Sequence, residues 1–294
     1  MLTGINTRRC SPSGGRHPSI FDALRMRRDA RYFRKVLVMQ RHQFSAMAAA
    51  CLLLTSGEAR ADDEEPRSDG RGYSLSVGPG AGVIPTFQGS DKSRVIPLPL
   101  IDGRYGRFFI DTSEGIGVDI LRDDTFRVGA SLTYVPGYDK DDVPTGIEGI
   151  ADTAGARVFG SARIDRFTFS LGATQSIGGA KGLVADAALS YYLPVTPNFA
   201  LIPSVGTTWA DGKYMDNYFG ISAGEATASG LPAFKAKSGF KDASLSVTGV
   251  YQLSDCWTLT GNVSANMLLG AALDTPLNEE KWNPTGFLGV AYRF

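Results

Sequence analysis

The fold of this chain is decided by the stretch WTLTGNVSANM, which occupies residues 257–267. Its odd positions carry Trp, Leu, Gly, Val, Ala and Met, and its even positions carry Thr, Thr, Asn, Ser and Asn. Successive side chains of an extended strand point to opposite faces, so this alternation predicts a β-strand with one apolar and one polar face. No window of the chain shows an apolar period of 3.6 residues sustained over the length of a helix.

The same alternation recurs through the chain and predicts about twelve strands. Each is close to the roughly 9 to 11 residues that cross a bilayer when tilted. Besides 257–267, the clear runs are 167–174, 243–254 and 288–294, and the noisier ones fall near 73–85, 95–104, 107–112, 115–121, 126–136, 155–165, 182–194 and 199–210.

Alternating strands fit a soluble sandwich, with its apolar face inward, or a membrane barrel, with its apolar face outward. The polar face here is mostly Ser, Thr, Asn and Gly, and it is poor in the Lys and Glu that usually cover a soluble sheet. The charges that fall on it are Asp119, Arg127, Arg157, Arg163 and Asp186. This composition is typical of a crowded barrel lumen.

Connections and aromatic residues also favour the membrane barrel. Short connections alternate with long ones, as expected for periplasmic turns and outer loops. The short ones are 123–124, 165–166, 196–198 and 254–255, and the long ones are 138–154 and 211–242. Beside the short turns lie the aromatic residues expected of an interfacial girdle, namely Phe126, Phe167, Tyr191, Phe199, Tyr251, Trp257, Tyr292 and Phe294. We therefore expect an all-β protein, a transmembrane antiparallel β-barrel of the bacterial outer membrane with about 12 strands.

Charge is divided unevenly along the 294 residues. Residues 1–61 hold 11 of the 30 Lys and Arg but only 3 of the 30 Asp and Glu, so the remainder is acidic by 8 charges. Both histidines, His17 and His42, also precede residue 62. Without histidine the remainder has no His general base, His-activated nucleophile or His-ligated metal, and its acidity disfavours nucleic acid. We expect no enzyme, catalytic residue, cofactor, metal site or nucleic-acid partner.

The N-terminal segment has the layout of a secretory signal peptide. From a start at Met39, Arg41 precedes an apolar run at 44–54, and an Ala-Arg-Ala sequence ends at Ala61, after which we expect cleavage. The apolar run is too short to span a bilayer as a helix, which needs roughly 20 residues. The expected organisation is an extension and signal peptide at 1–61, a periplasmic stub at 62–72, and a single barrel domain at 73–294 with a long outer loop at 211–242.

Several stretches resemble the MipA/OmpV family of outer-membrane proteins. WADGKYMDNYFGI at 209–221, SGLPAF at 229–234 and GFKD at 239–242 are similar to that family's long loop, although Gly212 stands where an acidic residue is expected. PTFQGSD at 85–91 resembles its first hairpin. The residues of the loop motif are Trp209, Asp211, Tyr214, Met215, Tyr218, Phe219, Gly220, Gly230, Leu231 and Pro232.

The resemblance implies a Gram-negative outer-membrane barrel. MipA-type members are adaptors between a lytic transglycosylase and a bifunctional murein (peptidoglycan) synthase, and OmpV-type members are surface proteins and antigens. At the C-terminus, Gly289, Tyr292 and Phe294 resemble the signal read by the barrel-assembly machinery, although Phe287 departs from the polar residue expected at its head. Implied partners are therefore outer-membrane lipid and lipopolysaccharide, the assembly machinery and the two murein enzymes.

Two local interpretations stay open in the sequence. The aromatic residues of the long loop could pack as a plug or lid on the barrel mouth, or they could contact a ligand or partner. The acidic stretch Asp139–Asp142, with Glu148 and Asp152 nearby, could bind divalent cations. A solvated acidic loop explains it as well, because its spacing does not match a calcium loop.

Two functional classes follow. The first, implied by the family resemblance alone, is a non-enzymatic scaffold that holds murein enzymes at the outer membrane. The second is a pore for small solutes, or a surface protein for binding or adhesion. About twelve strands make a lumen wider than that of a filled eight-stranded barrel and narrower than that of a porin with 16 to 18 strands.

Overall fold

The computed structural model describes residues 73–294, so the predicted signal peptide, cleavage site and periplasmic stub lie outside the described residues. The strands are β1 (Ser74–Gly78), β2 (Gly80–Pro85), β3 (Ser93–Pro97), β4 (Leu100–Tyr105), β5 (Phe108–Asp111), β6 (Gly115–Arg122), β7 (Phe126–Val135), β8 (Thr153–Ile164), β9 (Phe167–Ser176), β10 (Leu183–Tyr191), β11 (Leu193–Thr196), β12 (Phe199–Ala210), β13 (Gly239–Gln252), β14 (Trp257–Leu268) and β15 (Trp282–Arg293). The helices are α3 (Gly212–Phe219), α4 (Ala223–Ser229) and α5 (Gly270–Asp274). In the described part of the chain, no helix has the length and apolar character to cross a membrane.

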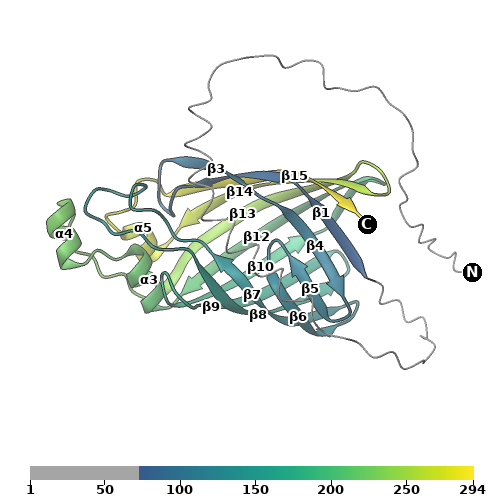
Figure 1. Ribbon diagram of the computed structural model, residues 1–294, viewed down its shortest axis with the longest axis horizontal. Coiled ribbons are helices and arrows are strands. Elements are labelled where there is room, and N and C mark those ends of the chain that lie inside the picture. The colour runs from purple at the N-terminus through teal and green to yellow at the C-terminus, as the bar shows by residue number, and fades with distance from the viewer. Residues whose placement is uncertain (1–72) are drawn as a thin grey trace, which may run out of the picture. The chain divides into compact units, whose positions relative to one another are not determined.

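The strands form one antiparallel sheet that closes on itself (Figure 1). Closure is made by β15, which pairs with β1 at Val77 and Tyr292 and with β2 at Gly80 and Gly289. Three barrel strands are interrupted, because β1 continues as β2, β3 as β4, and β10 as β11. The 15 segments therefore make a closed barrel of 12 strands, which confirms the architecture expected from the alternation.

Proline explains the first interruption. Pro79 has no backbone N–H for the ladder, but its carbonyl still accepts a hydrogen bond from the Val290 N–H at 3.0 Å. At Gly78 the neighbouring strand approaches so closely that an added Cβ would collide with the Val290 carbonyl oxygen. The chain therefore bends at this point while the ring stays closed.

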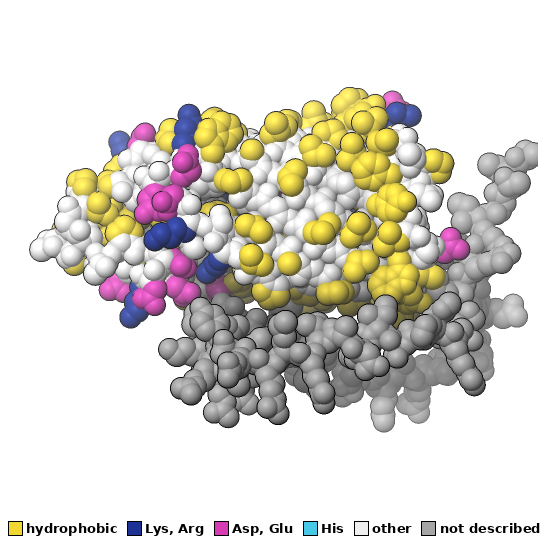
Figure 2. All heavy atoms as spheres, turned by 90° about the horizontal axis from the view of Figure 1, so that it is seen from above, with side chains coloured by type: hydrophobic (Ala, Val, Ile, Leu, Met, Phe, Trp, Pro, Cys, Tyr) yellow, Lys and Arg dark blue, Asp and Glu magenta, His cyan; other side chains and the backbone are white. Residues whose placement is uncertain are grey.

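The outer wall of the barrel is apolar, as the alternation predicts. Large hydrophobic side chains such as Val158, Leu245 and Leu288 are more than half exposed on it, and Figure 2 shows charged side chains gathered mainly at one end. The girdle predicted beside the short turns is present as pairs of neighbouring rings. Their centroids are 4.9 Å apart for Phe167 and Tyr191, 6.1 Å for Phe199 and Tyr251, and 5.0 Å for Trp257 and Tyr292.

The two ends of the barrel differ in their connections. One end has short turns, of which 123–125 is held by Asp123, whose carboxylate accepts hydrogen bonds from the backbone N–H groups of Phe126 at 2.6 Å and Thr125 at 2.8 Å. These hydrogen bonds lower the pKa of Asp123. The other end carries the long loops and α3, α4 and α5 (Figure 1).

The predicted loop boundary at residue 242 is wrong. The long loop covers residues 211–238, because β13 begins at Gly239, which pairs with Ala210, and Phe240 pairs with Trp209. The pairing passes through an irregularity between Thr208 and Trp209, where Lys241 is the extra residue of β13. The strand signal at these positions is hidden because a β-bulge breaks the period-two alternation.

Candidate functional site

The lumen near the short-turn end contains a network of charged side chains around Asp119 of β6. Its side chain is 4% exposed and lies 2.8 Å from Arg127 Nε, 3.2 Å from Arg104 Nη1 and 3.5 Å from Arg122 Nη1. Asp119 and Arg127 were expected on the lumen face, whereas Arg104 and Arg122 were not identified from the sequence. Arg104 Nε also lies 3.7 Å from a carboxylate oxygen of Asp102, so three arginines meet two carboxylates and the network holds one excess positive charge.

Aromatic rings hold Arg127 in place. Phe109 of β5 and Phe159 of β8 are 5.7 Å apart edge to face, although two strands separate β5 from β8 in the sheet. Their contact therefore passes through the barrel interior. The Arg127 guanidinium lies 4.7 Å from the centroid of each ring, within the range of a cation–π interaction. These side chains narrow the lumen.

A second charged group lies across β8, β9 and β10. Arg157 Nε is 2.7 Å from a carboxylate oxygen of Glu114, and Arg157 Nη1 is 2.5 Å from one of Asp186. The guanidinium lies over Gly172 of β9, where any Cβ would overlap it. Arg157 and Asp186 were predicted lumen residues, and Glu114 was missed because it lies in a connection rather than in a strand.

The outer mouth of the barrel is covered by the cap, which we define as α3 with the side chains packed on it from the outer loops. The helix begins after Asp211, whose carboxylate accepts the Tyr214 N–H at 2.7 Å and so caps its N-terminus. Met215 is fully buried and Phe219 is 1% exposed. Tyr214 and Tyr218 stack at 5.6 Å on the same side of the helix.

Four other loops are attached to α3. Phe87 of the first outer loop contacts Tyr138 of the third at 5.9 Å, and Tyr138 contacts Tyr218 at 5.1 Å. The Asn217 amide donates to the Ala180 carbonyl at 2.5 Å, and the Thr275 hydroxyl donates to the Phe219 carbonyl at 2.7 Å. Of the two roles open for the loop aromatics, this packing favours the lid, and contact with a ligand or partner stays a prediction.

Burial changes the chemistry of three residues, Tyr138, Tyr214 and Tyr218, which we call the cap tyrosines. Removal from water disfavours the phenolate, so the pKa of each is raised well above the usual value of about 10. The Tyr138 hydroxyl donates to the Tyr218 carbonyl at 3.2 Å, and the Tyr218 oxygen accepts the Gln88 N–H at 3.3 Å. The cap tyrosines therefore stay neutral at physiological pH.

The remaining residues of the loop motif shape the loop. Trp209 is the next-to-last residue of β12, and Gly220 follows α3 as its C-cap. Gly230 ends α4 with φ +75°, a left-handed conformation that favours glycine. Leu231 packs against the cap, and Pro232 is exposed beside it. The structure thus brings the motif together at one end of the barrel, while Phe87 and Tyr138 of the cap were not identified as site residues.

The acidic stretch at 139–142 forms no cluster of ligands. Asp142 lies 3.4 Å from Arg94 of β3, and Asp152 accepts the Gly137 N–H at 2.8 Å. Within residues 73–294, no group of three or more His, Cys, Asp or Glu side chains could hold a metal ion. Lys241 lies inward, where it is 4% exposed and paired with Asp242, and its ammonium donates to the Gln88 side chain at 3.2 Å.

The C-terminal residues of the predicted assembly signal lie on the closing strand. Gly289 faces Gly80 across the β15–β2 pair, and the Phe294 N–H donates to the Leu75 carbonyl at 2.9 Å. The Tyr292 and Phe294 rings are 5.0 Å apart at the short-turn end. The recognition of these residues during assembly stays a prediction.

A closed antiparallel ring with an apolar outer wall, an aromatic girdle and a polar interior defines the class of this protein, a transmembrane β-barrel of the bacterial outer membrane. The sequence profile of the family described as MltA-interacting protein MipA matches residues 77–294. The chain belongs to this MipA family, as the resemblance of its long loop and first hairpin implied.

The individual relatives found share only a low sequence identity with this chain. The chain is 24% identical over 122 residues to YiaT of Escherichia coli (strain K12), named as a candidate outer membrane protein, across 42% of this chain and 49% of YiaT. It thus spans about half the length of the curated relatives it matches. Among solved structures, the KdgM porin has a TM-score of 0.41 at 9% identity, covering 74% of this chain and 99% of that one. An outer membrane channel from Pseudomonas putida F1 has a TM-score of 0.40 at 11% identity, covering 79% and 100%.

Proposed function

We propose that this protein is a non-enzymatic anchor of the outer membrane that holds a lytic transglycosylase and a murein synthase beside the murein layer. The family's description as an MltA-interacting protein supports the first partner. The observation that carries the proposal is the capped outer mouth, because a barrel closed there is suited to anchoring rather than to transport. In this proposal the chain reaches the membrane through a cleaved signal peptide.

The partner-binding surface would be the periplasmic rim, which consists of the short turns. Its exposed charged residues include three arginines and two aspartates, namely Arg107, Arg166, Arg293, Asp124 and Asp255. Charged groups at an interface set its specificity and its association rate. Because the turns are short, an interface of ordinary size would need most of this rim.

Site-specific photo-crosslinking in cells tests this proposal. A photoreactive amino acid at Asp124, in a periplasmic turn, should form an adduct with a lytic transglycosylase. The matched control is Gly224 of α4, where an added Cβ meets no atom within 4 Å, so the same amino acid is accommodated at the outer end. Adducts from neither position, or from Gly224 alone, would contradict a periplasmic adaptor.

The second candidate is a surface-binding or pore function. A cavity of about 580 Å³ lies among the outer loops and is lined by Tyr138, Glu148, Asp216, Glu225 and Lys235, among others. Transport would require the cap to move, since it covers the mouth above the charged lumen. Stable conductance by the purified protein would favour this candidate.

A further inference from the structure

A second cavity lies at the outer rim of the barrel, outside the cap and away from the periplasmic rim. It has a volume of about 550 Å³ and lies between the segment 234–240 and α5. Charged and apolar groups share its lining, which includes Phe234, Lys235, Lys237, Phe240, Leu269 and Asp274. Neither the loop motif nor the lumen network uses its lysines.

The two lysines lie on either side of a buried residue, next to a segment held by backbone hydrogen bonds. Phe234 forms an isolated β-bridge with Ile221, with backbone hydrogen bonds of 2.8 and 3.0 Å. Two residues further on, Ala236 is 2% exposed and packs in the cap. Lys235 and Lys237 lie on either side of Ala236, and both are exposed and line the cavity.

The two lysines differ in their surroundings, because Lys235 also lines the other outer-loop cavity with Glu148, Asp216 and Glu225. Within residues 73–294, neither Lys235 nor Lys237 has a carboxylate oxygen within 4.0 Å, whereas Lys241 is paired with Asp242. Asp274 is the carboxylate in the cavity lining, so the lining holds two ammonium groups and one carboxylate. It therefore carries one net positive charge and is suited to an anion, and Lys237 is the lysine that lines this cavity and not the other one.

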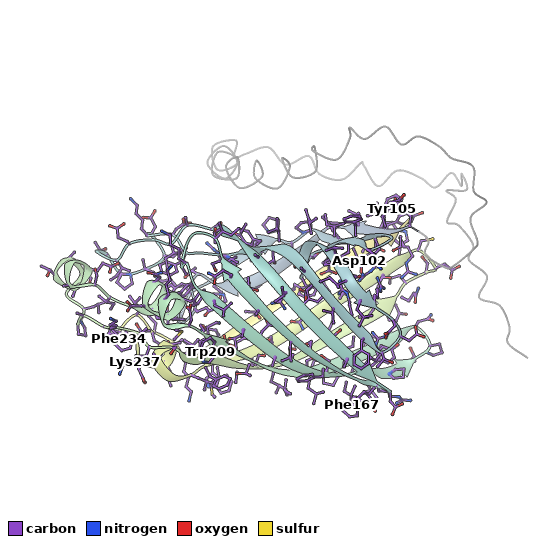
Figure 3. All side chains as sticks on the ribbon, turned by 90° about the horizontal axis from the view of Figure 1, so that it is seen from below. Asp102, Tyr105, Phe167, Trp209, Phe234 and Lys237 are labelled. Atoms are coloured by element: carbon purple, nitrogen blue, oxygen red, sulfur yellow. The ribbon has the colours of Figure 1, made fainter. Side chains whose placement is uncertain are left out.

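The apolar side of the cavity is continuous with the membrane-facing wall. Phe240 is 58% exposed on the outer face and pairs with Trp209, and the α5 end of the cavity adds Leu269. Figure 3 shows Trp209, Phe234 and Lys237 near one another at the loop end of the barrel. Aromatic residues at strand ends mark the boundary between hydrocarbon and head groups. The cavity is thus placed where a lipid phosphate meets its acyl chains.

We propose that this cavity binds a phosphorylated glycolipid of the outer leaflet, with Lys235 and Lys237 contacting its phosphate and Phe240 and Leu269 contacting an acyl chain. The ammonium groups supply charge-assisted hydrogen bonds to phosphate oxygens. The apolar side chains select a lipid over a free anion of the same charge. This site is independent of the partner proposed for the periplasmic rim, and it would fix the cap to the membrane surface.

Native mass spectrometry of the full chain released from detergent tests the site. The probes are lipid A with two phosphates, the same lipid without phosphates, and inorganic phosphate as a competitor. Charge-assisted hydrogen bonds of ordinary strength predict that Lys235→Gln with Lys237→Gln weakens binding of phosphorylated lipid A about tenfold or more. The matched control is Lys92→Gln with Lys140→Gln, which removes the same charge from exposed lysines of other outer loops and should change binding less than about twofold.

Each other outcome would overturn the proposal. Equal binding by both double variants would mean that the attraction is general to the outer loops. Equal binding of the lipid without phosphates would remove the role of the lysines, and full displacement by inorganic phosphate would identify a free-anion site. Cold and boiled electrophoresis of each variant verifies that the barrel is folded before the affinities are compared.

Discussion

Replacing Leu245 with arginine tests which face of the wall meets lipid. Leu245 lies in the middle of β13, between Val205 and Ala265 on the paired strands, and its side chain is 59% exposed on the outer face. Leu245→Arg places a guanidinium near the centre of the hydrocarbon layer, where water cannot solvate it. The substitution should therefore destabilise the folded barrel strongly.

The size of this effect follows from the depth of the residue. Arginine at the midplane of a lipid-facing strand costs about 2 to 4 kcal/mol, which reduces the folding equilibrium constant roughly 30- to 700-fold. The matched control is Ser246→Arg, one residue further along β13 on the lumen side. Ser246 lies between Ser204 and Ser264, so its neighbours are small and polar, and the expected cost is about 1 kcal/mol or less.

The assay is urea-dependent refolding into lipid vesicles, with the folded fraction read from the mobility shift between cold and boiled samples. Leu245→Arg should lower the urea midpoint well below that of the unsubstituted chain, and Ser246→Arg should leave it nearly unchanged. Leu245→Ala separates the loss of the leucine from the addition of charge. Equal losses for the two arginine variants would refute the assignment of the faces.

Three further predictions concern the lumen, the cap and the C-terminus. Asp119→Asn removes the buried carboxylate at the centre of the Arg127 network and should cost about 3 kcal/mol, seen as a lower temperature for the electrophoretic shift; an unchanged temperature would mean that this carboxylate does not stabilise the barrel. The cap tyrosines have raised pKa values, so the opened cap loses protons first and the closed cap loses stability as the pH rises above about 10. Proteolysis of the loop should therefore begin only above this pH, and proteolysis at neutral pH would mean that the cap is already open. Deleting Phe294 should lower the amount of protein in the outer membrane, and normal amounts would exclude its role in assembly.

Much of the barrel is predictable from the sequence because each strand has lipid on one face and the lumen on the other. In the stretch 257–267, each side chain faces either lipid or lumen, so the environment imposes a period of two that the sequence displays directly. The same reasoning gives the number of strands, the aromatic girdle and the difference between short turns and long loops. It also places Asp119, Arg127, Arg157 and Asp186 in the lumen.

Features that depend on contacts between distant residues are not visible in this way. Lys241 occupies a bulge, which shifts the alternation and hides the start of β13. Tyr138 packs in the cap, although the sequence of its loop predicts an acidic, solvated segment. Phe109 contacts Phe159 across the lumen. Loops carry no periodic pattern, so the helices of the long loop and their packing require the three-dimensional structure.

Conductance in a planar lipid bilayer tests most directly the claim that the cap makes this barrel a closed anchor. The purified full barrel should show no stable current steps. A variant in which a short Gly-Ser linker replaces residues 212–236 should keep its heat-dependent mobility shift and conduct, because it lacks α3 and the residues that close the mouth. Stable steps of equal size from the unaltered protein and the variant would contradict the account and favour a pore.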